Sequence, residues 1–147
     1  MGKLVLPKSG IVYVDTSVLI YTIKGHPDYY SLLQPLWLKF QLGEIEIVSS
    51  EIIIMEVLVL PLRNVDTSLI ADYEQLLFSS KIQLIPIRKP VLRETANLRA
   101  TTNLKTPDAI HAATALSVNC TQFLSNDKGF RHIVDLPVVV LSEVLAS

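Results

Sequence analysis

The fold is decided by Ile11-Val12-Tyr13-Val14-Asp15-Thr16-Ser17 (residues 11–17), an apolar run that ends at a carboxylate followed by two hydroxyls. A run of four apolar residues is typical of a strand that is buried on both faces of a parallel sheet. Asp15 would then lie at the carboxyl end of that strand, the edge at which open α/β sheets bind ligands. The stretch therefore predicts both the type of sheet and the place of a functional site.

Four more short apolar runs follow along the chain, and segments of helix length separate them. The predicted strands cover about 11–15, 45–49, 82–87, 121–125 and 137–141, and the predicted helices cover 17–24, 29–42, 50–60, 68–79, 89–102 and 106–118. We expect Pro61 to stop the third helix, and Thr106 to cap the sixth with Pro107 in its first turn. This alternation predicts an α/β fold, a three-layer α/β/α sandwich around a five-stranded parallel sheet, but no strand order. No repeat or long linker interrupts residues 1–147, so we expect a single domain.

The composition favours a protein without a membrane span or a disulfide. Half of the 147 residues are hydrophobic and the mean hydropathy is +0.41, yet no run reaches the roughly 18 apolar residues of a membrane helix. Thirteen basic and fourteen acidic side chains give a net charge of −1, which argues against a broad basic face for nucleic acid. Cys120 is the single cysteine and no signal-peptide pattern is present, so we expect a cytoplasmic protein. The apolar excess predicts a sheet that is buried on both faces, a surface that a partner covers, or both.

Four carboxylates follow or flank the apolar runs: Asp15, Glu56, Asp108 and Asp127. Each has an ordinary explanation, as a helix cap, a solvent-facing helix position, a first-turn acid or a turn residue. Ser17 can cap the first helix equally well, which would leave Asp15 free. Four acids gathered at one edge of a sheet would repel each other unless a cation lay among them. The set therefore predicts a metal site, and its oxygen ligands favour Mg²⁺ over zinc.

Glu56 stands out among these acids because the rest of its helix is apolar, and a carboxylate there is costly to bury unless it is paired or bound to metal. Glu51 is a rival for the same role. It lies about 140° around the helix from Glu56, in the first turn, where an acid simply complements the helix dipole. We therefore prefer Glu56. His111 has no second histidine or cysteine nearby, so we expect it to pack or to orient a ligand.

Four motifs in this order resemble the PIN domain, and most of all its VapC-type toxin branch. They are Tyr13-Val14-Asp15-Thr16-Ser17-Val18-Leu19-Ile20, Glu56 in its apolar helix, Thr106-Pro107-Asp108-Ala109-Ile110-His111-Ala112-Ala113 and Phe123-Leu124-Ser125-Asn126-Asp127-Lys128-Gly129-Phe130. The resemblance covers residues 11–142 and implies a three-layer α/β/α fold with a five-stranded parallel sheet. It implies a ribonuclease that depends on Mg²⁺ or Mn²⁺ and whose acidic residues match Asp15, Glu56, Asp108 and Asp127. It also implies a homodimer, the toxin of a toxin–antitoxin pair, inhibited by a small antitoxin whose C-terminal segment inserts near the acidic site.

The hypothesis for the chemistry is hydrolysis of RNA phosphodiester bonds. We expect Asp15, Asp108 and Asp127 to hold the metal, directly or through water, with Glu56 as a ligand or as the base that orients water. Three side chains are expected to orient these ligands or to bind metal-bound water: Thr16, Ser125 and Asn126. Two cations that follow Asp127 are expected to contact the RNA substrate, namely Lys128 and Arg131, ahead of Lys105 and Arg99.

The apolar excess also predicts contacts with a second subunit and with the antitoxin. The candidates are Tyr29, Tyr30, Leu33, Trp37 and residues 57–62, although packing in the core explains them equally well. The alternative function is a catalytically silent PIN-like module that binds RNA or protein. A receiver-type phosphoacceptor domain ranks third, because it would need a second acid directly after Asp15, where this chain has Thr16.

Overall fold

A parallel sheet of five strands forms the middle layer of the molecule, which the computed structural model describes over residues 2–147. The strands are β1 (Ile11–Val14), β2 (Glu46–Ser50), β3 (Gln83–Ile85), β4 (Gln122–Ser125) and β5 (Val138–Val140). The helices are α1 (Thr16–Lys24), α2 (Tyr30–Gln41), α3 (Ile52–Arg63), α4 (Thr67–Ser79), α5 (Lys89–Thr101), α6 (Thr106–Ser117) and α7 (Leu141–Ala146), with a 3₁₀ turn η1 (Lys128–His132). The predicted three-layer α/β/α fold is confirmed.

The strand order is β3-β2-β1-β4-β5, and all four neighbouring pairs are parallel. The chain builds outward from β1 to β3, then returns to the other side of β1 for β4 and β5. Tyr13 of β1 pairs with Val48 of β2 and with Phe123 of β4, so β1 is the central strand. The direction of winding reverses between β1 and β4, and a crevice at the carboxyl ends of two such strands is where open α/β sheets bind ligands.

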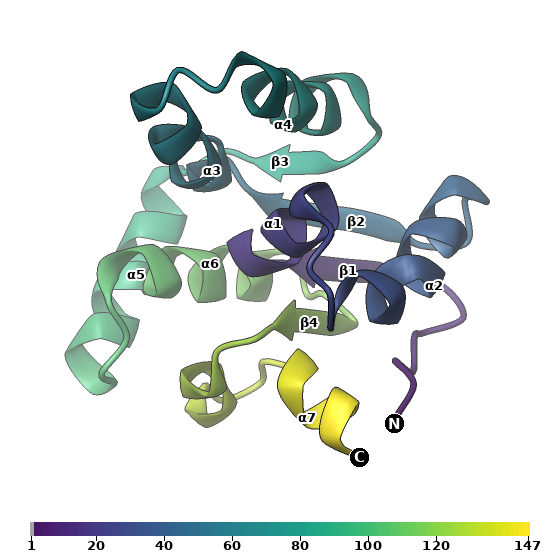
Figure 1. The fold of residues 1–147 in the computed structure, drawn as a ribbon. Coiled ribbons are helices and arrows are strands. Elements are labelled where there is room, and N and C mark those ends of the chain that lie inside the picture. The colour runs from purple at the N-terminus through teal and green to yellow at the C-terminus, as the bar shows by residue number, and fades with distance from the viewer. Residues whose placement is uncertain (1) are drawn as a thin grey trace.

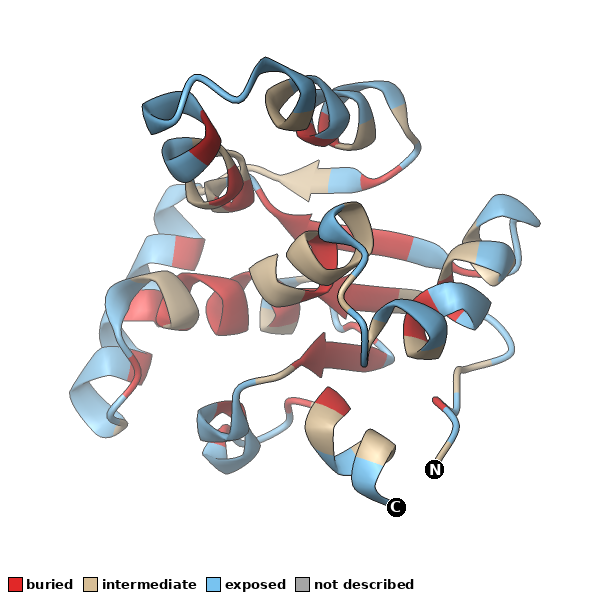
Figure 2. Ribbon diagram, in the orientation of Figure 1, coloured by how far each residue is buried: buried red, intermediate tan, exposed pale blue. Residues whose placement is uncertain are grey.

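The two faces of the sheet are covered by different helices (Figure 1). Val12, Val14 and Leu124 belong to one cluster, together with the apolar sides of α1, α2, α3, α4 and α7. Tyr13 and Phe123 point to the other face, toward α5 and α6, and their rings stack with centroids 5.1 Å apart. Because both faces are covered, the central strands are buried along most of their length (Figure 2).

Helix α6 lies close to the sheet because the side chains that face it are small. Four of its residues are alanines buried in the second cluster: Ala109, Ala112, Ala113 and Ala115. This helix begins at the carboxyl edge of the sheet, so its close packing fixes the position of its first turn relative to β1. Of the helices in the described part of the chain, none is long and apolar enough to cross a membrane.

Several details differ from the sequence predictions. Helix α3 continues through Pro61 to Arg63: proline removes one backbone donor, but the Pro61 side chain is buried and α3 packs on α4. The N-cap of α6 is Lys105 rather than Thr106, a shift of one residue. Helix α7 was not predicted at all, and it is anchored by the fully buried Leu141.

The predicted partner contacts are wrong for three side chains because the core buries them. Leu33, Val57 and Pro61 face inward from α2 and α3 and are inaccessible to a partner. Tyr30 remains exposed, while Tyr29 and Trp37 are partly buried against the first cluster. In residues 57–62 the exposed side chains are Val59, Leu60 and Leu62.

Candidate functional site

All four predicted carboxylates line one hollow of about 320 Å³ at the switch point between β1 and β4. We call it the acid hollow; it is lined by Asp15, Thr16, Ser17, Ile20, Tyr21, Glu56, Asp108, His111, Asn126 and Asp127. Asp15 directly follows β1, and Asp127 follows β4. Asp108 lies in the first turn of α6, and Glu56 lies in the middle of α3. Glu51 is exposed at the start of α3 and does not line this hollow. The structure therefore favours Glu56 over Glu51.

Asp15 is the most firmly held of the four acids, with 7% of its surface exposed. Its Oδ1 accepts hydrogen bonds from the Ser17 amide (3.1 Å) and the Ser17 hydroxyl (2.6 Å), and its Oδ2 accepts one from the Ser125 hydroxyl (2.5 Å). Burial raises the pKa of Asp15, and the Ser125 and Ser17 hydroxyls oppose that rise. Asp15 is therefore both the N-cap of α1 and part of the hollow, so the alternative cap at Ser17 is wrong.

Glu56 is held by a histidine and a threonine. Its Oε1 lies 2.7 Å from His111 Nε2 and accepts a hydrogen bond of 2.7 Å from the Thr16 hydroxyl. Burial acts to raise the pKa of Glu56, but the hydrogen bond and charge of His111, with the Thr16 hydroxyl, lower it below its ordinary value. Glu56 is therefore ionised at neutral pH.

His111 connects Glu56 to the centre of the sheet. It is 1% exposed, and its Nδ1 lies 2.6 Å from the hydroxyl of Tyr13. Glu56 Oε1 and the Tyr13 hydroxyl therefore engage the two ring nitrogens of His111. Sequence analysis predicted a packing or orienting role for His111, but its position in an apolar helix did not reveal these two partners.

Asp108 differs from the other acids because it accepts no hydrogen bond from residues 2–147 in this structure. It is half-buried in the first turn of α6. Burial raises the pKa of Asp108, and the negative charge of Asp127 raises it further. His111 opposes this rise, and Asp15 and Glu56 add smaller contributions that raise the pKa. Positive charge would stabilise a carboxylate in this position, but no lysine or arginine lines the acid hollow.

Asp127 is exposed and caps the short turn η1. Its Oδ1 accepts a hydrogen bond of 2.8 Å from the Gly129 amide. Its own amide donates to the Ser125 hydroxyl at 2.9 Å, and that hydroxyl donates to Asp15. Ser125 therefore sets the position of two carboxylates at once. The ordinary explanations, a helix cap for Asp15 and a turn residue for Asp127, are correct and are compatible with a shared site.

The other predicted site residues fall into two groups. Thr16 and Ser125 bond to carboxylates of the hollow, as expected of orienting side chains. Asn126 instead connects α1 and α7: its Nδ2 donates to the Tyr21 hydroxyl (3.0 Å) and its Oδ1 accepts from the Ser142 amide (2.8 Å).

The two cations predicted to contact substrate lie apart from the acid hollow. Arg131 forms an ion pair with Glu143 of α7, and neither Lys128 nor Arg131 lines the hollow. Their contact with substrate stays a prediction.

The donor chemistry of the acid hollow fits a hard divalent cation. It offers carboxylate and hydroxyl oxygens, no thiol, and a histidine whose Nε2 is already engaged by Glu56. In the present arrangement, no group of three or more His, Cys, Asp or Glu side chains within residues 2–147 is placed to hold a metal ion. Repulsion from Asp127 adds to the burial that raises the pKa of Asp108, as expected of carboxylates that lie near one another. Metal binding by Asp15, Asp108 and Asp127 therefore stays a prediction.

Comparison with known proteins agrees with this geometry. The sequence profile of the PIN domain matches residues 12–136, whereas no curated protein matches the chain. Among solved structures, VapBC2 from Rickettsia felis bound to a promoter DNA fragment has a TM-score of 0.71 at 20% identity, over 88% of this chain and 98% of that one. A toxin–antitoxin complex from Klebsiella pneumoniae has a TM-score of 0.64 at 24% identity, over 88% and 96%. VapBC-5 from Mycobacterium tuberculosis has a TM-score of 0.58 at 19% identity, over 91% and 99%. Because the profile spans most of the chain and the fold agrees with it, the protein belongs to the PIN-domain family.

Proposed function

We propose that this chain is a Mg²⁺- or Mn²⁺-dependent endoribonuclease that hydrolyses RNA phosphodiester bonds, and that it is the cytoplasmic toxin of a toxin–antitoxin pair. The observation that carries the proposal is the acid hollow, in which four elements far apart in sequence bring four carboxylates to the switch point of the sheet. Structural likeness to toxin–antitoxin complexes supports the biological role.

In this proposal each side chain has a distinct task. Asp15, Asp108 and Asp127 would hold the metal, with Asp15 fixed by Ser17 and Ser125. A bound Mg²⁺ or Mn²⁺ supplies a lowered pKa for water and neutralises charge on the scissile phosphate.

Glu56 would orient the attacking water and receive its proton. Its Oε1 is occupied by Thr16 and His111, while its Oε2 has no partner among the described residues. Oε2 is therefore the atom that would bind the attacking water. His111 keeps the carboxylate ionised and oriented, which is the state that a base requires.

The decisive test is cleavage of a structured RNA by the purified chain with Mg²⁺, with Mn²⁺, with EDTA, and with the Asp15→Asn variant. Cleavage should require the metal and should be lost in Asp15→Asn. Asp72→Asn is the matched control, because Asp72 is an exposed carboxylate on α4 outside the acid hollow. Cleavage that survives both EDTA and Asp15→Asn would overturn the mechanism. No cleavage and no metal-linked thermal shift would indicate the silent binding module instead.

Exposed apolar side chains on one pair of packed helices support the proposed homodimer and antitoxin contacts. Met55, Val59, Leu60 and Leu62 are exposed on α3, and Phe78 is exposed on α4. Light scattering tests the dimer. Co-expression with the small protein encoded by the neighbouring reading frame tests the antitoxin. A monodisperse monomer that retains no small partner would contradict this part of the proposal.

A further inference from the structure

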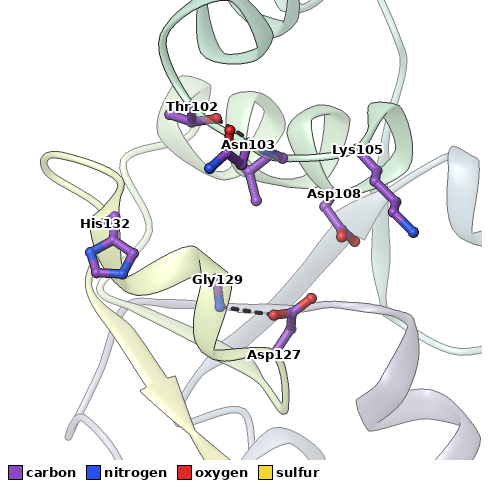
Figure 3. A pocket seen from close by; sticks show the side chains of 8 residues that line it. Thr102, Asn103, Lys105, Asp108, Asp127, Gly129 and His132 are labelled. Atoms are coloured by element: carbon purple, nitrogen blue, oxygen red, sulfur yellow. Dashed lines mark hydrogen bonds between the residues drawn. The ribbon is translucent and has the colours of Figure 1, made fainter.

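A second hollow adjoins the acid hollow on the other side of Asp108 and Asp127. It measures about 530 Å³ and lies between the α5–α6 connection and η1 (Figure 3). Its lining consists of Thr102, Asn103, Leu104, Lys105, Asp108, Asp127, Gly129 and His132. We call it the flanking hollow. Its volume is within the roughly 300–1,000 Å³ of ligand pockets, and the two shared carboxylates form its boundary with the acid hollow.

The two hollows differ in charge. The acid hollow is lined by four carboxylates and by no lysine or arginine. The flanking hollow adds no carboxylate beyond the two that are shared, and its lining includes one lysine, Lys105 (Figure 3). A polyanion that reaches Asp108 and Asp127 therefore meets less negative charge on the side of the flanking hollow than on the side of the acid hollow.

The far part of the flanking hollow carries groups suited to a nucleobase. Asn103 and His132 are exposed, and within residues 2–147 neither side chain makes a hydrogen bond to the protein. An amide can pair with the edge of an unstacked base, and an imidazole ring can stack on its face. The buried Leu104 gives the hollow an apolar wall.

The rim is fixed before any ligand binds. The Thr102 hydroxyl donates to the Leu98 carbonyl (2.6 Å) and accepts from the Leu104 amide (3.2 Å). Arg99 Nε donates to the Leu104 carbonyl at 3.4 Å. These bonds hold the segment that presents Asn103, which reduces the entropy lost on binding.

Gly129 keeps the wall of the flanking hollow open beside Asp127. A Cβ at this position would lie 3.1 Å from Asp127 Oδ1, tighter than ordinary contact, and 3.9 Å from Leu104 Cδ2. The residue with no side chain therefore leaves room between the shared carboxylate and the apolar wall.

From these features we infer that the flanking hollow binds the nucleoside next to the scissile phosphate of single-stranded RNA. In this arrangement His132 stacks on the base, Asn103 hydrogen-bonds to its edge, and Lys105 contacts the adjoining phosphate. The inference rests on the proposed ribonuclease function, which it extends by assigning substrate recognition to residues outside the acid hollow.

The experiment uses a short randomised single-stranded RNA, with cleavage sites mapped by sequencing in Mg²⁺ and binding measured by fluorescence anisotropy. Asn103→Ala and His132→Ala should each lower kcat/KM about tenfold and should flatten the nucleotide preference beside the cut. His132→Phe should retain the preference, because it keeps a ring that can stack. Lys105→Ala should weaken all sequences equally and reduce the salt dependence of binding.

Two control variants match the tested side chains at other places. Asn97→Ala removes an exposed amide on α5, and Lys81→Ala removes an exposed ammonium that precedes β3, at the opposite edge of the sheet. Both should behave like the parent chain, and melting temperatures of all variants report any loss of fold.

The outcomes separate this inference from the proposed function. If the parent chain cleaves RNA and Asn103→Ala and His132→Ala cleave the same sites at the same rates, the flanking hollow is not a nucleoside site. If the parent chain does not cleave but binds RNA, and these variants bind less tightly, the site stands and the hydrolytic function falls. If the parent chain neither binds nor cleaves single-stranded RNA, both are overturned.

Discussion

Asp15 and Asp108 lie at two sides of one hollow, and they are held in opposite ways. Burial raises the pKa of both carboxyls. Asp15 receives three hydrogen bonds from Ser17 and Ser125, whereas Asp108 receives none from the described residues and is repelled by Asp127. Hydrogen bonds within the fold therefore hold the carboxylate of Asp15, whereas that of Asp108 is not held by any hydrogen bond from the described residues. A bound cation should change the environment of Asp108 more than that of Asp15.

The largest expected effect is on catalysis, where the two acids should behave alike. Asp15→Asn and Asp108→Asn should each lower kcat/KM for RNA by about 100-fold or more, since each removes a negative ligand from the proposed metal. Initial rates at saturating Mg²⁺ measure this, with Asp72→Asn as the control. If the variant at either position retains most of its activity, that acid is not required for catalysis.

The increase in stability on Mg²⁺ binding should depend on Asp108. Mg²⁺ at 100 times its Kd should add about 2.7 kcal/mol to the free energy of unfolding of the parent chain. Asp108→Asn should lose most of this increment, because the repulsion that the cation relieves is reduced. Thermal shift with Mg²⁺ and with EDTA tests this, and an equal increment in the parent chain and in Asp108→Asn would show that the cation does not relieve repulsion at Asp108.

Stability without metal should show opposite signs at the two positions. Ser125→Ala removes a buried hydroxyl that bonds to Asp15 and accepts from the Asp127 amide, and should cost about 1–3 kcal/mol. Asp108→Asn should instead be neutral or raise stability by about 0.5 kcal/mol, because it removes like-charge repulsion. Urea unfolding in EDTA measures both, and destabilisation of similar size in the two variants would show that Asp108 is also structurally anchored.

The smallest expected effect is on the pH dependence of stability. The pKa of Asp108 is raised, so the folded state holds this proton above the ordinary value of 3.8, and stability falls as pH rises from there to the raised pKa. The pKa of Glu56 is lowered, so its contribution is present above the ordinary value of 4.5 and is lost as pH falls through the lowered pKa.

Metal-free urea titrations across the acidic range check these signs. Asp108→Asn should remove a decrease of stability with rising pH. Glu56→Gln should remove an increase of stability with rising pH. Slopes that change in the same direction for both variants would refute the assigned shifts.

The acids could be found from the sequence because each follows a recognisable element. Asp15, Asp108 and Asp127 come after apolar runs or open a helix, and parallel strands bring such positions to one edge. The strand order could not be found, because runs that are apolar on both faces do not identify their neighbours. The rotation of α3 was also hidden, since that helix is apolar on most sides, and only the structure distinguishes Glu56 from Glu51.

The flanking hollow and the two partners of His111 could not be predicted from the sequence, for a different reason. Thr102 and Asn103 belong to a connection whose shape depends on bonds to Leu98 and Leu104. His111 bonds to Tyr13 and Glu56, which lie far from it in sequence. Such contacts exist only after β1, α3 and α6 have packed, so no local sequence pattern predicts them.

The place of β4 in the sheet has a consequence for protein synthesis. β4 inserts beside the central strand β1 although β2 and β3 are made earlier, and it carries Ser125 directly before Asn126 and Asp127. Until this segment has left the ribosome, Asp15 Oδ2 lacks the Ser125 hydroxyl and Asp127 is missing from the acid hollow. A nascent chain still joined to its messenger RNA therefore carries an incomplete set of acids during most of its synthesis.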